Sequence, residues 1–160
     1  MADSIETGAA HGRARKGRGA LSNRESRYMP THVEWDDGIE GPTPITECRA
    51  VNARTIIARN NSPDIPFEQS INPYQGCEHG CVYCYARPTH AYLDLSPGMD
   101  FETRLTYKRN AAEQLTKELS RPGYRCRTIT LGANTDPYQP IEKELGITRE
   151  ILAVMLEMKH

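Results

Sequence analysis

Three cysteines stand within eight consecutive positions of the chain. Three residues separate Cys77 from Cys81, and two separate Cys81 from Cys84. A short loop with this spacing can turn three thiolates toward one point, and thiolates are soft ligands that suit zinc ions and iron-sulfur clusters. The spacing therefore predicts a metal site rather than a set of disulfides.

Three thiolates leave one position of such a site open. Structural zinc takes four ligands, so a histidine such as His79 or His90 would have to complete a zinc site. A 4Fe-4S cluster has four irons, and the fourth iron would stay free to bind a substrate or a cofactor. The spacing favours the cluster and keeps zinc as the alternative. Gly76 and Gly80 agree with a loop that wraps around a cluster, because glycine adopts left-handed backbone angles without strain.

The elements around the cysteines predict two βα units. In chain order, β-branching, helical periodicity and turn residues predict a side strand over 54–58, a strand over 70–73, the cysteine loop over 74–87, a helix over 110–120, a strand over 127–131, a second loop over 132–142 and a helix from Thr148. Asn110 and Glu113 have the spacing of a capping box at the start of the first helix.

Consecutive βα units place their strands parallel, so both loops open at the same edge of the sheet. Ligands gather at this edge in parallel α/β architectures. We therefore expect the cysteine loop and the second loop to be neighbours in space and to form one candidate site.

The cysteine spacing, with Tyr83 just before the last cysteine, resembles the signature of the radical S-adenosylmethionine (radical SAM) superfamily. Five segments narrow the resemblance to a largely uncharacterised radical SAM family related to spore photoproduct lyase, the DNA repair photolyase-like proteins. These segments are residues 16–20, 57–60, 72–92, 100–103 and 131–142.

The resemblance implies a set of site residues. Cys77, Cys81 and Cys84 would hold a 4Fe-4S cluster whose open iron binds S-adenosylmethionine, and Tyr83 would lie near the adenine. The superfamily often has a Gly-Gly-Glu-like segment that binds the methionyl amine. This chain departs from it in the second loop, where the polar contacts would come from Asn134, Thr135 and Asp136.

The same resemblance implies an enzyme. One electron from the cluster would cleave S-adenosylmethionine to give a 5'-deoxyadenosyl radical, which abstracts hydrogen from a substrate. The reductant would be of the flavodoxin or ferredoxin type, and DNA or RNA is the substrate class that the related lyase suggests by analogy. The alternatives that the residues leave open are a non-catalytic zinc-binding module and a nucleic-acid-binding module with a basic tail.

The predicted organisation has three parts. Residues 1–30 are rich in glycine and basic residues and read as a disordered tail, residues 31–53 read as an irregular linker, and residues 54–160 read as an incomplete radical SAM domain. The fold class is α/β, namely the first two βα units of a partial (β/α) radical SAM barrel. Such barrels usually have six or more units, so we expect the chain to be a fragment whose longer relatives complete the barrel.

Composition narrows the compartment and the partners. The formal net charge is -1, which provides no overall attraction to nucleic acid or acidic membranes. The sequence shows no apolar stretch of transmembrane length and no signal peptide pattern, so we expect a cytoplasmic protein without a membrane partner. Cys48 and Cys126 stand apart from the motif, and packing alone explains them best.

Overall fold

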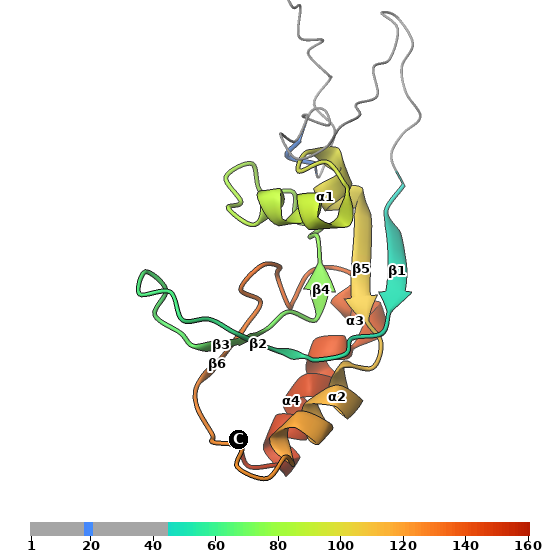
Figure 1. Ribbon diagram of the computed structural model, residues 1–160. Helices are drawn as coiled ribbons and strands as arrows, with labels where there is room; N and C mark the ends of the chain where they lie inside the picture. The colour runs from blue at the N-terminus through green and yellow to red at the C-terminus, as the bar shows by residue number, and fades with distance from the viewer. Residues whose placement is uncertain (1–17, 21–44) are drawn as a thin grey trace, which may run out of the picture.

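The computed structural model describes residues 18–20 and 45–160 and shows a mixed α/β protein (Figure 1). Most of the predicted tail over residues 1–30 lies outside the described residues. The predicted linker over 31–53 is described only from residue 45.

Six short strands form two three-stranded sheets within the described residues. The first sheet has the order β1-β5-β4 and the second the order β2-β3-β6. The strands are β1 (Glu47–Val51), β2 (Ile57–Arg59), β3 (Gln69–Ile71), β4 (Tyr74–Gln75), β5 (Arg104–Lys108) and β6 (Ile129–Leu131). The chain passes from the second sheet to the first at Asn72 and Pro73, directly before the cysteine motif.

The helices separate into two groups. The 3-10 helix η1 and the short helix α1 lie together at one end of the first sheet, whereas α2 and α4 pack side by side at the other end of the molecule (Figure 1). The helical elements are η1 (Arg87–Leu93), α1 (Met99–Thr103), α2 (Ala111–Leu119), α3 (Glu142–Leu145) and α4 (Ile147–Glu157).

The main hydrophobic core joins the second sheet to α2 and α4. Helix α2 buries Ala111, Leu115 and Leu119, which recur at intervals of four residues and so share one helix face. They pack with Ile71 of β3 and Ile151 of α4, both fully buried. The core therefore fixes the position of the strand that leads to the cysteines.

Strands β3 and β6 confirm the predicted parallel arrangement. They are hydrogen-bonded neighbours in parallel, with Gln69 opposite Ile129 and Ile71 opposite Leu131. The β3–β6 register ends at Ile71 and Leu131, so the segments that follow both strands leave the sheet at the same edge. The side strand is also present, although it begins at Ile57 rather than Arg54 and runs antiparallel to β3.

The predicted irregular linker is wrong over Glu47–Val51. This segment is strand β1, which pairs in parallel with β5 along its whole length. The folded domain therefore begins before residue 54. The alternation of charged and apolar residues in Glu47–Val51 is weak, and its partner β5 was not predicted as a strand, so the pairing had no sequence signal of its own.

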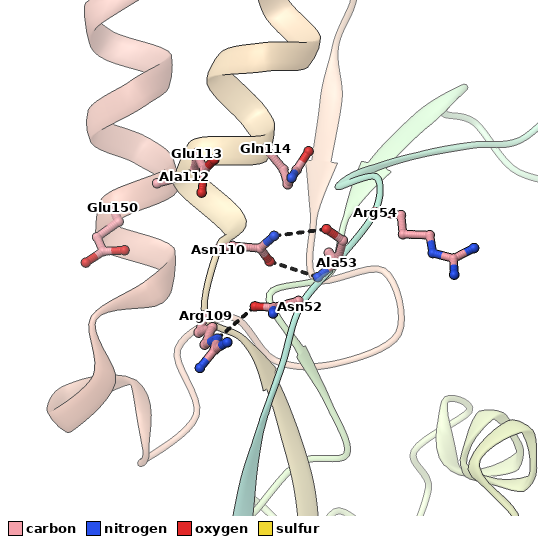
Figure 2. A pocket seen from close by; sticks show the side chains of 9 residues that line it. All are labelled: Asn52, Ala53, Arg54, Arg109, Asn110, Ala112, Glu113, Gln114 and Glu150. Carbon is pink, nitrogen blue, oxygen red and sulfur yellow. Dashed lines mark hydrogen bonds between the residues drawn. The ribbon is translucent and has the colours of Figure 1, made fainter.

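The predicted capping box at Asn110 is also wrong. The Asn110 side chain does not cap α2; it accepts a hydrogen bond from the Ala53 amide at 2.8 Å and donates one to the Ala53 carbonyl at 3.0 Å. Figure 2 shows this pair among the residues that line a pocket between α2 and the segment after β1. Asn110 thus ties the start of α2 to the end of β1. None of the predicted site residues lines this pocket.

The barrel itself is not seen in the part of the chain that the structure describes, where the strands form two small open sheets. In residues 18–20 and 45–160, no helix combines the length and the apolar character needed to cross a membrane.

Candidate functional site

The cysteine loop leaves β4 and runs to η1, and its first cysteine is held against the short helix α1. The Cys77 amide donates a hydrogen bond of 2.9 Å to the Phe101 carbonyl. Cys77 is buried in a small apolar cluster with Ala86 and Phe101, and Cys84 packs against this cluster. Cys77 and Cys84 thus share one apolar cluster, whereas the motif spacing predicts that all three cysteines turn toward one point.

All five cysteines lie in the described part of the chain and are free thiols. Burial raises the pKa of the Cys77 thiol above its ordinary value, and interactions with the backbone of His79 and Asp136 oppose this rise. Among the described residues, no three His, Cys, Asp or Glu side chains stand close enough together to hold one metal ion. The roles of Cys77, Cys81 and Cys84 as metal ligands therefore remain predictions.

Two glycines give the loop its course. Gly76 has a φ of 80° and Gly80 a φ of 63°, both in the left-handed region that L side chains rarely adopt. Gly76 also has no room for a side chain, because an added Cβ would lie 2.6 Å from Leu105 Cδ2 and 2.8 Å from the Phe101 carbonyl oxygen. The predicted need for glycine at both positions is confirmed.

The second loop, which follows β6, contacts the cysteine loop through buried side chains. Thr135 Oγ1 donates a hydrogen bond of 2.7 Å to the Gly76 carbonyl. Gln139, which is 1% exposed, donates to the same carbonyl at 3.4 Å and accepts from the Glu78 amide at 3.1 Å. The two loops are thus neighbours, as the order of the βα units predicts.

Polar groups of the second loop also meet the cysteine loop nearer the surface. His79 Nε2 lies 3.3 Å from Asp136 Oδ2, and both side chains are partly exposed. The Asn134 amide donates to Asn72 Oδ1 at 2.8 Å, and the Tyr85 hydroxyl donates to the Ala133 carbonyl.

The predicted cofactor contacts in the second loop differ in exposure. Thr135 is buried, and its hydroxyl contacts the cysteine loop. Asn134 is exposed, whereas the half-exposed Asp136 faces His79 through Oδ2 and accepts a hydrogen bond of 2.7 Å from the Tyr138 backbone amide through Oδ1. The structure therefore gives Thr135 a supporting position, engages Asp136 with His79 and Tyr138, and leaves Asn134 exposed.

The tyrosines of the motif do not form a common cover. Tyr83 is 86% exposed and Tyr85 is 76% exposed, whereas Tyr74 belongs to the main hydrophobic core. Tyr74 donates a hydrogen bond to Glu142, which also accepts from the Thr148 amide at the start of α4. Tyr74 therefore belongs to the core, whereas Tyr83 and Tyr85 are exposed.

Among the residues that the structure describes, neither candidate histidine joins the cysteines in a group that could hold a zinc ion. His79 faces Asp136. His90 is buried, its Nε2 lies 3.0 Å from the Arg104 carbonyl, and its ring meets Phe101 edge-on.

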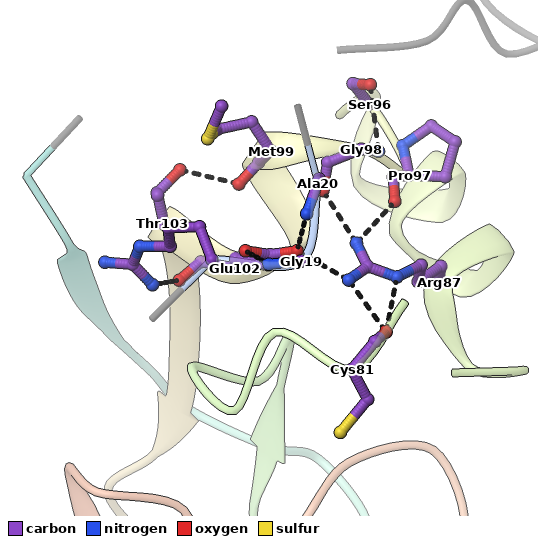
Figure 3. A network of polar contacts seen from close by, with 11 residues as sticks. Gly19, Ala20, Cys81, Arg87, Ser96, Pro97, Gly98, Met99, Glu102 and Thr103 are labelled. Atoms are coloured by element: carbon purple, nitrogen blue, oxygen red, sulfur yellow. Dashed lines mark hydrogen bonds and ion pairs between the residues drawn. The ribbon is translucent and has the colours of Figure 1, made fainter. Parts of the chain in front are cut away.

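Sequence reasoning missed Gln139, Arg87 and Glu102. The guanidinium of Arg87 donates two hydrogen bonds to the Cys81 carbonyl, at 2.9 and 3.1 Å, and forms an ion pair of 2.5 Å with the fully buried Glu102 (Figure 3). Charged residues usually lie on the surface, so nothing in a single sequence marks this pair as buried. The only signal was that all three residues fall inside segments that carry the family resemblance.

No protein-family profile and no solved structure matches the chain. The chain is similar to uncharacterized proteins of mycobacteria, including Rv2578c of Mycobacterium tuberculosis and Mb2609c of Mycobacterium bovis, at 46% identity over 95 residues. The match covers 59% of this chain and 28% of the length of each relative. The chain is thus similar to one part of considerably longer mycobacterial proteins.

Proposed function

We propose that the chain is the 4Fe-4S cluster and S-adenosylmethionine binding part of a radical SAM enzyme. The observation that carries the proposal is the contact between two loops at one sheet edge. The loop with three cysteines follows β4, which comes directly after Asn72 and Pro73 at the end of β3, and the loop with Asn134 and Thr135 follows β6, the parallel neighbour of β3. Ligands of parallel α/β proteins bind at this edge.

The residues present fit an iron-sulfur cluster. Three thiols in one loop are the donor set that such clusters use, and two glycines with positive φ give the backbone the turns needed to wrap around it. Each cysteine of a 4Fe-4S cluster binds a different iron, so the three sulfurs need not converge on one point. Cys77, Cys81 and Cys84 would hold the cluster.

When bound, the cluster supplies one electron for the reductive cleavage of S-adenosylmethionine, whose 5'-deoxyadenosyl group then abstracts a hydrogen atom from the substrate. The residues of this chain would bind S-adenosylmethionine and orient it. Asp136 and Asn134 would meet the polar end of S-adenosylmethionine, and the exposed ring of Tyr83 would offer an apolar surface for the adenine. Thr135 and Gln139 hold the cysteine loop in place from beneath.

We assign β3 and β6 to the first two strands of a partial (β/α) barrel. Two features support this: the strands are adjacent and parallel, and α2 and α4 pack on the same core as β3.

The proposal also implies partners and a compartment. The electron would come from a reductant of the flavodoxin or ferredoxin type, and a nucleic acid is the candidate substrate class by analogy alone. A reduced cluster and five free thiols suit the reducing cytoplasm.

Cysteine variants test the proposal. After anaerobic reconstitution with iron and sulfide, the chain should bind about four irons, and alanine at position 77, 81 or 84 should remove most of them. Cys126→Ala is the matched control, because Cys126 is exposed and lies outside the motif. Equal iron content in all four variants, or one zinc per chain and no iron, would refute the proposal.

A further inference from the structure

A segment near the N-terminus lies directly against the cysteine loop. Gly19 sits so close to the loop that an added Cβ would lie 1.7 Å from the Gly80 carbonyl oxygen and 3.0 Å from Val82 Cγ1. No side chain fits in this space, and the nearest obstacle is backbone. Residues 18–20 therefore touch the loop between its first and second cysteines, although about sixty positions of sequence separate the two.

The buried carboxylate of Glu102 holds this segment in place. Its Oε1 accepts a hydrogen bond from the Ala20 amide at 2.8 Å, and its Oε2 accepts from the Gly19 amide at 3.2 Å. Arg18 adds two further bonds, to the Glu102 carbonyl at 2.9 Å and to Thr46 Oγ1 at 2.6 Å. The segment is thus bound through two backbone amides and the Arg18 side chain, and Glu102 is the centre of the contacts.

Glu102 connects the segment to Cys81 through Arg87. Besides Glu102 and the Cys81 carbonyl, the Arg87 guanidinium donates to the carbonyls of Pro97 at 3.3 Å and Gly98 at 3.1 Å. These contacts use all five N–H groups of the guanidinium, so Arg87 has none left for a ligand. Figure 3 shows the Cys81 carbonyl facing Arg87 while its thiol points away from the network.

We infer that Arg18–Ala20, Glu102 and Arg87 form a lock that positions Cys81, with Arg87 and Glu102 as positioning residues. The lock fixes the Cys81 backbone on one side, so that the thiol is presented on the other. Gly19 closes the lock by filling the space beside Gly80. The role of the lock in cluster binding rests on the proposed function. The lock itself is present in the protein without a cluster.

The test measures the chain before any iron is added. Two readouts are the rate at which iodoacetamide alkylates Cys81 and the hydrogen exchange of the Cys84 amide, which donates to the Cys81 carbonyl at 3.2 Å. We expect Gly19→Ala and Arg87→Lys to increase both rates about fivefold or more, because they open a locally closed structure. Gly123→Ala is the control, since Gly123 also has a positive φ but no atom within 4 Å of an added Cβ.

One further measurement and one further variant distinguish a local opening from global unfolding. Exchange of the buried core at Leu115 and Ile151 reports whether a variant has unfolded as a whole. Should Gly19→Ala unfold the core, Arg18→Gln replaces it, because that change removes two hydrogen bonds of the segment without adding a clash.

The iron content of the same variants distinguishes failure of the lock from failure of the proposed radical SAM function. If both rates rise with an intact core and iron binding falls, the lock and the proposed function stand together. If both rates rise although the unaltered chain binds no iron, the lock stands and the proposed function fails. If neither rate changes in Gly19→Ala, Arg87→Lys or Arg18→Gln, the lock is refuted whatever the iron content.

Discussion

Thr135 Oγ1 donates a hydrogen bond of 2.7 Å to the carbonyl oxygen of Gly76, the residue directly before the first cysteine of the motif. The donor is buried, and it comes from the loop that follows the parallel neighbour of the strand leading to the motif. This bond joins two loops that lie 59 positions apart in sequence. The candidate site depends on this junction.

Replacing Thr135 by valine should weaken the junction. Valine matches threonine in shape but cannot donate, so the buried Gly76 carbonyl would keep only the longer bond from Gln139. We expect the free energy of unfolding to fall by about 1–3 kcal/mol, measured by urea denaturation. Thr135→Ser retains the hydroxyl and should lose clearly less stability; equal losses in both variants would contradict the role given to the hydrogen bond.

A side chain at position 76 should damage the site more than a side chain at position 123. Both glycines have a positive φ, so alanine costs each of them about 1–2 kcal/mol of backbone strain. Only at Gly76 would the new Cβ also meet the Phe101 carbonyl and Leu105. Iron content after anaerobic reconstitution should fall sharply in Gly76→Ala and stay unchanged in Gly123→Ala. Normal iron content in Gly76→Ala would show that the loop tolerates a side chain at position 76, and would contradict this prediction.

The buried histidine should make stability depend on pH in the mildly acidic range. Burial lowers the pKa of His90 below its ordinary value of 6.5, and Nδ1 has no hydrogen-bond partner among the described residues. The unfolded chain therefore takes up a proton first as the pH falls, so the contribution of His90 is present above pH 6.5 and is lost as the pH falls through the folded pKa.

Urea midpoints between pH 7 and pH 5 measure this dependence. They should fall more steeply in the unaltered chain than in His90→Gln, whose amide can still donate to the Arg104 carbonyl but does not titrate. Parallel slopes would mean that His90 is not the group responsible.

Asn110→Asp separates the observed contact from the predicted cap. Aspartate caps helices as well as asparagine does, so a capping role would leave stability unchanged. A carboxylate can still accept from the Ala53 amide but faces the Ala53 carbonyl without a proton to donate. We expect a loss of about 1–2 kcal/mol in the free energy of unfolding, measured by urea denaturation. An unchanged value would restore the capping interpretation.

The parts of the fold that sequence predicted are those with a local pattern. The periodic apolar residues of α2, the β-branched run of β6 and the turn residues after it were all visible, and the parallel pairing of β3 with β6 followed from their order. The positive φ of Gly76 and Gly80 agrees with the left-handed angles expected of a loop that wraps around a cluster.

The parts that were missed depend on contacts between distant segments. Strand β1 exists because β5 lies beside it, and Asn110 turns from its helix to Ala53 because that backbone comes within reach. Glu102 and Arg87 are charged residues that a single sequence places on the surface. Glu102 is fully buried and the Arg87 side chain is only 13% exposed, because each neutralises the other and their polar atoms are hydrogen-bonded.

The most direct test of the account is the spectrum of the reconstituted chain with and without S-adenosylmethionine. Anaerobic reconstitution should give a brown protein with about four irons per chain, and the electron paramagnetic resonance signal of the reduced cluster should change when S-adenosylmethionine is added. The same addition should change nothing in a Cys81→Ala variant. A colourless protein that binds zinc but no iron, or a cluster whose signal ignores S-adenosylmethionine, would contradict the account.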